Sequence, residues 1–214
     1  MSAPLGKKLK AVKWGNFSIS QIFNKVVQGR RLKKDDQLPG NIPFVMSGTT
    51  NTGVVGYISN PVATFPANSI TVDIFGNAFY RGYQFGAGDD TGVYWNTEKN
   101  FSKETMLFFA IAINRALYGK FSYGKKLRSS QSLDIKIKLP ITNTGEIDYT
   151  FMETFIRELE EERIRELAAY LTASGLTDYH LTPPKLILFI NLIKQFGVPS
   201  IWRNYMENRH AASA

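Results

Sequence analysis

Four clusters of cationic, hydroxyl and amide side chains are the residues of this chain whose types and spacing could bind a ligand directly. They are Arg30, Arg31, Lys33 and Lys34; Ser47, Thr49, Thr50 and Asn51; Asn77, Tyr80, Arg81, Tyr83 and Gln84; and Lys125, Lys126, Arg128, Ser129, Ser130 and Gln131. Lysine and arginine neutralise phosphates, and arginine, asparagine, glutamine and serine can hydrogen-bond to base edges. Each cluster alone is typical of a solvated loop, but four of them with interleaved tyrosines favour nucleic-acid binding.

The last cluster belongs to the stretch FSYGKKLRSSQSLDIKIKLP at residues 121–140, whose first half is basic and has little apolar anchoring. Three explanations fit such a loop: a solvated surface, an anion site or a contact with nucleic acid. The residue types also leave the kind of nucleic acid open. RNA and single-stranded DNA remain alternatives to the duplex, because tyrosines stack on unpaired bases.

Motifs for catalysis are missing from the chain. It contains no GxGxxG, P-loop, GxSxG or HExxH motif, and no adenine-methylating motif of Asn or Asp followed by Pro-Pro and an aromatic residue. The lack of cysteine excludes disulfides, thiol catalysis and cysteine-bound zinc. Asp89 and Asp90 lie among glycines, which predicts a turn. We therefore expect a binding protein with no catalytic residues, no metal site and no cofactor of its own.

Charge is unevenly distributed along the 214 residues, whose formal net charge is +8. Residues 1–142 hold 19 Lys or Arg against 8 Asp or Glu, whereas residues 143–214 hold 7 against 10. This indicates a basic body that meets a polyanion; the alternative is a basic protein with an ordinary charged helix. The longest apolar run, LILFI at 186–190, is far shorter than the ~20 residues of a membrane span. We expect no membrane contact and a cytoplasmic location.

Short strands separated by Gly, Pro, Asn and Ser are the pattern of the first two thirds of the chain. The predicted strands are FVMSG at 44–48, VVGYIS at 54–59, ITVDIFG at 70–76 and LDIKIKLP at 133–140. A buried helix is predicted over residues 102–119, where Ser102 can cap the start and Gly119 can end it.

A long amphipathic helix is predicted over residues 150–172. Asp148 or Thr150 can cap its start, and Gly175 can end it. Apolar residues recur on one stripe at helical spacing, and the other face is charged. The stripe must pack either on its own domain or on a second helix, and the residues that we expect to pair with a second helix are Met152, Phe155, Ile156, Leu159, Leu167 and Leu171.

These patterns predict an α+β fold divided into three regions. Residues 1–145 form a mixed domain with a β-sheet core. Residues 146–174 form the long helix, used for coiled-coil-like pairing, and residues 175–214 form a tail with a short helix.

A series of motifs along the chain is similar to one protein family. The series begins with Trp14, Phe17, Ile19, Ile22 and Phe23, and continues with GRRL at 29–32, GNIPFV at 40–45, NTGV at 51–54, GYI at 56–58, NSITV at 68–72, GNAFY at 76–80, IKLP at 137–140 and GEIDYTFME at 145–153. In order and spacing these motifs resemble the target recognition domain of DNA specificity subunits in type I and related restriction-modification systems. The resemblance covers about residues 14–172.

This resemblance implies a recognition domain that reads one half of a split double-stranded DNA sequence through the major groove. It implies no catalysis in the chain itself. The implied partners are an adenine-N6 methyltransferase subunit that uses S-adenosylmethionine and a restriction and translocase subunit that uses ATP and Mg²⁺. Within the basic loop we then expect Lys125, Lys126 and Arg128 to meet phosphate, with Ser130 and Gln131 as weaker candidates for base contact.

The sequence departs from the family because it shows one recognition domain and one helix, where a full-length subunit has two of each. It therefore resembles a half subunit. We expect a homodimer paired through residues 150–172 and a palindromic target with a non-specific spacer. The alternatives are a stand-alone or truncated DNA-binding module and a nuclease whose acidic cluster is not recognisable.

Overall fold

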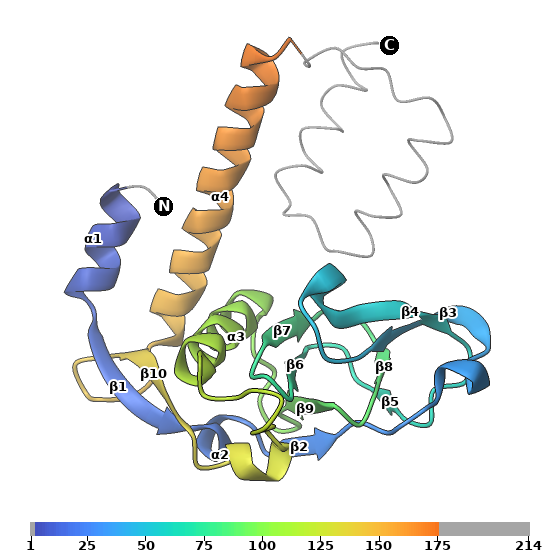
Figure 1. Cartoon of the computed structure of the whole chain (residues 1–214). Helices are drawn as coiled ribbons and strands as arrows, with labels where there is room; N and C mark the ends of the chain where they lie inside the picture. Colours follow the sequence, from blue (N-terminus) through green and yellow to red (C-terminus); the bar gives the residue numbers. More distant parts are fainter. Residues whose placement is uncertain (1–2, 176–214) are drawn as a thin grey trace. The chain divides into compact units, whose positions relative to one another are not determined.

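A computed structural model describes residues 3–175 of the chain (Figure 1). The chain divides into two compact units, Met1–Glu166 and Leu167–Ala214. The predicted short helix of the tail lies outside the described residues.

Ten strands in the described part of the chain form three sheets. A two-stranded sheet pairs β1 (Lys13–Ser18) antiparallel with β10 (Lys136–Ile141). The second sheet is antiparallel throughout and has the order β2 (Lys25–Gln28), β9 (Thr91–Trp95), β6 (Ser69–Asp73) and β7 (Ala78–Arg81). The third has the order β4 (Val54–Ile58), β3 (Pro39–Val45), β8 (Phe85–Ala87) and β5 (Thr64–Phe65), with β3 and β8 parallel. The predicted α+β class is confirmed.

The predicted strand over residues 133–140 is shifted in the structure, because β10 begins only at Lys136. The preceding residues turn instead and bind the start of the short helix α2 (Ile19–Ile22): the Ser20 amide donates to the Leu133 oxygen at 3.0 Å, and the Ile19 amide to the Ile135 oxygen at 3.1 Å. Leu133 is consequently 37% exposed rather than buried.

The helix predicted over residues 102–119 is α3 (Lys103–Leu117), which packs against β6, β7 and β10. Its predicted N-cap is confirmed, because the Thr105 amide donates to the Ser102 hydroxyl at 3.2 Å. Met106, Phe109 and Ile113 lie in the main core, but Ile111 is 57% exposed. The helix therefore buries one face and not its whole circumference.

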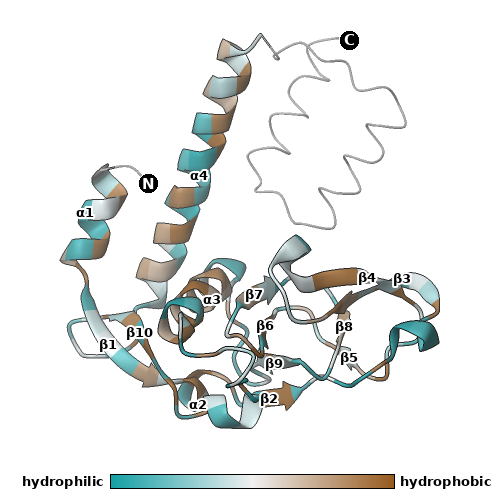
Figure 2. Cartoon of the chain, viewed as in Figure 1, coloured by the Kyte–Doolittle hydropathy of each residue, from teal (hydrophilic) through white to brown (hydrophobic). Residues whose placement is uncertain are grey.

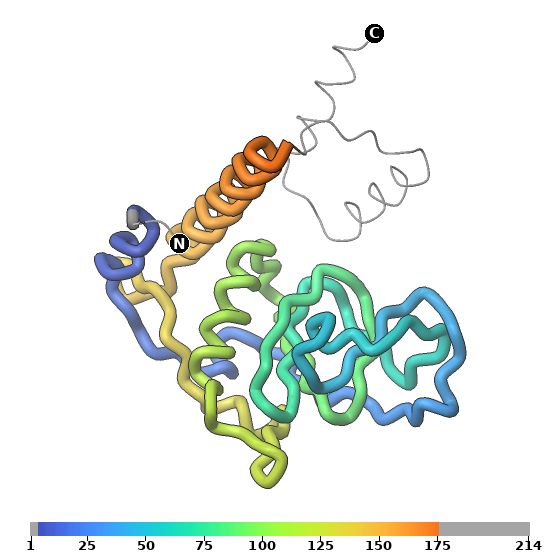
Figure 3. Tube along the Cα trace, turned by 45° about the horizontal axis from the view of Figure 1, so that its top comes forward, coloured from blue at the N-terminus to red at the C-terminus, as the bar shows by residue number. Residues whose placement is uncertain are grey.

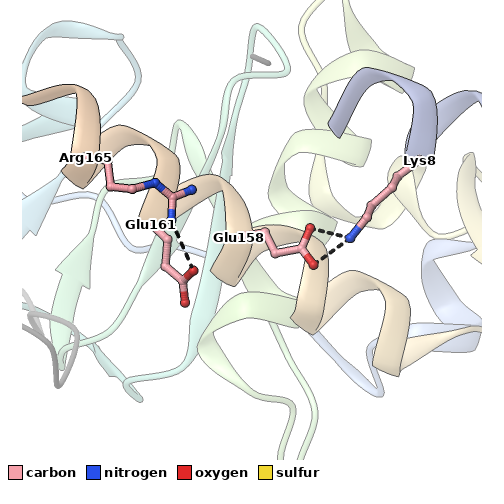
Figure 4. A network of polar contacts seen from close by, with 4 residues as sticks. All are labelled: Lys8, Glu158, Glu161 and Arg165. Carbon is pink, nitrogen blue, oxygen red and sulfur yellow. Dashed lines mark hydrogen bonds and ion pairs between the residues drawn. The ribbon is translucent and has the colours of Figure 1, made fainter. Parts of the chain in front are cut away.

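An N-terminal helix that the sequence patterns did not predict, α1 (Ala3–Ala11), contributes to the same core. Leu5 of α1 is only 4% exposed. Lys8 forms an ion pair at 2.6 Å with Glu158 of the long helix α4 (Tyr149–Ala173), as Figure 4 shows beside the weaker pair of Arg165 with Glu161 at 3.8 Å.

The long helix starts and ends at the predicted signals. The Phe151 amide donates to the Asp148 carboxylate at 2.9 Å, which caps the start of α4. Gly175 has a φ of +66°, a left-handed conformation suited to glycine, directly beyond the helix. Figure 2 shows hydrophilic and hydrophobic bands alternating along α4.

The first part of the apolar stripe of α4 packs on its own domain and is therefore not available to pair with a second helix. Met152, Phe155 and Ile156 are 0%, 6% and 3% exposed and belong to the core of their own domain. The prediction that these three residues form a dimer interface is wrong, because the sheets and α3 already cover them. Leu159 is partly buried against the same core, whereas Leu167 is 50% exposed.

Candidate nucleic-acid interface

The end of β8 and the turn that follows it contact three of the four predicted clusters. Asp89 and Asp90 form this turn, as their glycine-rich context predicts. The Arg30 amide donates to the Ala87 oxygen at 2.8 Å, and the Ser47 amide donates to the Asp90 carboxylate at 3.0 Å. The Arg128 guanidinium donates to the Asp89 main-chain oxygen at 3.2 Å. Segments almost 100 residues apart in the chain therefore meet at one turn.

The fourth cluster is attached through a buried carboxylate. Asp73, at the end of β6, is 4% exposed and accepts hydrogen bonds from the Gly48 amide at 3.0 Å and the Asn77 side chain at 2.8 Å. Gly76 completes this turn with a φ of +89°. The Asn77 side chain is thus engaged within this turn while Asp73 holds the neighbouring loop, which leaves the Asn77 amide less free to contact DNA.

Arg81 does not lie on the interface, so its predicted role in direct DNA contact is wrong. Its side chain is 1% exposed, and its guanidinium donates to the Thr71 hydroxyl, the Tyr83 hydroxyl and both oxygens of Thr52. Within residues 3–175 it has no carboxylate partner. Burial lowers the pKa of Arg81 from its ordinary value. Through its hydrogen bonds to Thr52, Arg81 stabilises the loop before β4.

That loop contains the predicted residues Thr49, Thr50 and Asn51, all of which are exposed. It ends in a short 3-10 helix, η2 (Thr50–Gly53), in which Asn51 and Thr52 have φ values of 47° and 53°. Left-handed backbone costs non-glycine residues roughly 1–2 kcal/mol each, so surrounding contacts must hold the loop in place. Ser47 is only half-buried and uses its amide to bind Asp90.

The cations of the remaining clusters are exposed to solvent. Within the described residues none of them forms an ion pair with an acidic side chain, and they are Arg30, Arg31, Lys33, Lys34, Lys125, Lys126 and Arg128. Unneutralised cations on a fixed framework attract a polyanion and release counterions when it binds.

A cavity of about 740 Å³ lies between the loop before β3 and the turn after β8. Its lining includes Arg31, Lys33 and Lys34 from the loop before β3, Val55 from β4, and Asp89 from the central turn. Carboxylates in the lining keep the cavity from being uniformly positive, so the cations at its rim are the groups that can reach phosphate.

The basic loop after α3 is anchored to the body of the domain by Gln28 and Ile74, neither of which was predicted to belong to the site. The Ser129 amide donates to the Gln28 side chain at 3.1 Å, and the Leu127 amide to the Ile74 oxygen at 2.9 Å. Gln131 accepts from the Arg128 amide at 3.2 Å and so helps to shape the loop, while Ser130 is exposed. Gln28 gave no signal in the sequence, because only the fold brings β2 beside this loop.

Tyr80 is half-buried on β7 and packs against the main core. Burial raises its pKa, and the nearby Glu104 carboxylate raises it further. Part of its side chain is therefore used in packing and is not open to a ligand.

No group of three or more His, Asp or Glu side chains among residues 3–175 is placed to hold a metal ion. Over the same residues, no helix combines the length and apolarity required to cross a bilayer.

Comparison with known proteins identifies a family of DNA specificity domains. Residues 11–169 match the family model of the type I restriction modification DNA specificity domain. The type II restriction enzyme BgcI specificity subunit S.BcgI of Heyndrickxia coagulans is 32% identical over 161 residues, which are 73% of this chain and 46% of that protein. The chain therefore spans about half the length of this relative.

Solved structures share the fold. The type I restriction-modification S subunit from M. genitalium is similar with a TM-score of 0.52 at 15% identity, over 84% of this chain and 49% of that one. The HsdS subunit from Thermoanaerobacter tengcongensis is similar with a TM-score of 0.50 at 9% identity, over 79% and 44%. At these identities the likeness concerns the fold alone.

Proposed function

Because this chain belongs to the family of type I restriction modification DNA specificity domains, we propose that it reads one half of a split target in double-stranded DNA. It acts by binding and supplies no catalysis of its own. The observation that carries the proposal is the convergence of two basic segments, whose exposed cations have no acidic partner within residues 3–175, and one polar loop on the end of β8 and the Asp89–Asp90 turn.

Recognition depends on contacts with phosphates and on contacts with base edges. The cations of the loops before β3 and after α3 approach phosphates, which fixes the register of the domain on the duplex without reading sequence. The exposed hydroxyl and amide groups of Thr49, Thr50, Asn51 and Ser130 are then the candidates for base edges. Arg81, Asp73 and Asp90 hold the loop that carries Thr49, Thr50 and Asn51, and Gln28 holds the loop that carries Ser130, so binding does not have to order them first.

The partners of the chain follow from the family. We propose that it docks an adenine-N6 methyltransferase subunit, which holds S-adenosylmethionine, and a restriction and translocase subunit, which uses ATP and Mg²⁺. The chain spans 46% of the length of its S.BcgI relative. We propose that two copies present the two half-sites, which the exposed part of the α4 stripe supports. After the correction along α4, the residues left for pairing are Leu167 and Leu171, with Leu159 at the margin of the core.

The DNA-binding proposal is tested by titrating the full chain, alone and with its methylating subunit, against a random pool of duplex oligonucleotides at several salt concentrations. We expect log K to fall with log salt with a slope of about −0.9 for each phosphate contact. Sequencing the bound fraction should recover one enriched half-site. Binding that is weak and indifferent to salt in both states would reject the proposal.

The adaptor role has a separate test, in which the purified chain is incubated with plasmid and Mg²⁺. We expect intact plasmid after prolonged incubation. Nicking or cleavage by the chain alone, absent from a mock purification, would show that it carries a nuclease site.

A further inference from the structure

The segment between α3 and β10 has an unusual surface. Residues 118–133 contain no Asp or Glu and four cations, which are Lys120, Lys125, Lys126 and Arg128. Tyr118 and Tyr123 are 89% and 82% exposed, the highest values for large apolar side chains among the described residues. Of the two rings, only that of Tyr123 lies in the stretch 122–128 that carries Lys125, Lys126 and Arg128, and an exposed aromatic ring amid cations on a folded domain indicates an interaction surface.

Tyr123 lies at the tip of a tight hairpin. The Ser122 amide donates to the Lys125 oxygen, and the Lys125 amide to the Ser122 oxygen, both at 3.1 Å, so only Tyr123 and Gly124 form the turn. In Figure 3 the yellow-green tube after α3 projects from the body as a narrow loop. The Lys126 ammonium lies 4.4 Å from the centroid of the Tyr123 ring, which keeps a cation against the ring.

The base of this hairpin is fixed to the candidate interface. Leu127 directly follows it, is 3% exposed and donates its amide to the Ile74 oxygen at 2.9 Å. Arg128 comes next and binds the Asp89 main-chain oxygen of the central turn. The tip is therefore carried on an anchored support, while within residues 3–175 no aromatic ring stacks on Tyr123 itself.

We infer that Tyr123 is a DNA contact, in which its ring packs against sugar and base surface in a groove of the duplex while Lys125 and Lys126 approach the flanking phosphates. The inference rests on the proposed DNA-binding function. The charge of the segment favours DNA over a protein partner, because an acid-free surface complements a polyanion. The two-residue tip is narrow enough to enter a groove, and aromatic side chains gain energy there from contacts that do not depend on charge.

The test measures affinity and salt slope separately for the full chain, in the assembly state that binds duplex DNA. Tyr123→Ala should weaken binding on the order of tenfold, since an aromatic contact is lost, and leave the salt slope unchanged. Tyr123→Phe should retain affinity, because the ring and not the hydroxyl makes the contact. Lys125→Ala should instead make the slope shallower by about 0.9.

The matched control is Tyr118→Ala, which removes an equally exposed tyrosine at the end of α3 outside the hairpin. It should leave affinity close to that of the wild type. Wild-type affinity for Tyr123→Ala, or an equal loss for Tyr118→Ala, overturns the inference while the DNA-binding function stands. So does a Tyr123→Ala variant that binds DNA normally but no longer assembles with the methylating subunit. A wild-type chain that binds no duplex in either state removes the proposed function and the inference together.

Discussion

The guanidinium of Arg81 donates to the main-chain oxygen of Thr52 and, at 3.0 Å, to its hydroxyl. Thr52 is a β-branched residue with a φ of 53°, a conformation that such residues rarely adopt. A buried cation at the end of β7 therefore stabilises a strained loop that belongs to the candidate interface. The contact links the second sheet to the third, because the loop leads directly into β4.

Arg81→Met should destabilise the domain by about 1–3 kcal/mol, because methionine leaves the buried Thr71 hydroxyl and the two Thr52 oxygens without this donor. The free energy of unfolding in urea measures this loss. The same variant should lower the ratio of specific to non-specific DNA binding more than the salt slope, because the loop and not a phosphate contact is affected. Thr52→Ser keeps both acceptors and is the control. Unchanged unfolding and unchanged discrimination in Arg81→Met would contradict the role of the contact.

Arg31→Ala combined with Lys33→Ala removes two exposed cations from the rim of the cavity. The salt slope of DNA binding should become shallower by about 1.8, at about 0.9 per phosphate contact. Thermal stability should not change, because neither side chain is buried. Lys7→Ala combined with Lys99→Ala, two exposed lysines on other segments, serves as the control and should keep the wild-type slope. Equal effects of the two pairs would mean that only total charge matters.

A glutamate introduced at Leu159 should lower stability, whereas a glutamate introduced at Leu167 should affect self-association instead. Leu159→Glu should lower the free energy of unfolding by about 1–3 kcal/mol, since the side chain packs on the core of its own domain. Leu167→Glu should leave stability unchanged and weaken self-association, because Leu167 is 50% exposed. Urea unfolding and light scattering separate the two effects. Identical light scattering for the wild type and Leu167→Glu would argue against pairing through this part of the helix.

Tyr94 should make stability depend on pH in the alkaline range. Burial raises the pKa of Tyr94 to about 12, and its hydroxyl donates to the Ser132 hydroxyl at 2.9 Å. The unfolded chain loses this proton near pH 10, whereas the folded chain keeps it. The contribution of Tyr94 to the free energy of unfolding is therefore fully present below pH 10. It falls by roughly 2–3 kcal/mol as the pH rises from about 10 to about 12.

Tyr94→Phe provides the comparison for that pH profile. It should be less stable at neutral pH, because the Ser132 hydroxyl loses a partner, and its stability should fall less steeply above pH 10. Parallel profiles for the variant and the wild type, measured by urea unfolding at each pH, would show that other groups control the alkaline transition.

Local signals in the sequence were sufficient for the starts of α3 and α4 and for the central turn. Ser102 caps α3, Asp148 caps α4, and Asp89 and Asp90 form a turn, because each depends on hydrogen bonds and backbone preferences within a few residues. The order of family motifs and the basic character of residues 1–142 likewise lie in the sequence itself. Together they identified the family and the surface loops that carry its charge.

Tertiary structure alone decided which of the candidate residues are free to bind. Arg81 and Lys126 look equivalent as cations beside tyrosines, but one is buried under a loop and the other lies on an exposed hairpin. Phe155 and Leu167 belong to the same stripe, yet Phe155 lies in the core of its domain and Leu167 is 50% exposed. Burial depends on contacts between segments far apart in the chain, which spacing along one segment does not encode. The sequence therefore determined the family, and the fold determined which of the candidate side chains are exposed.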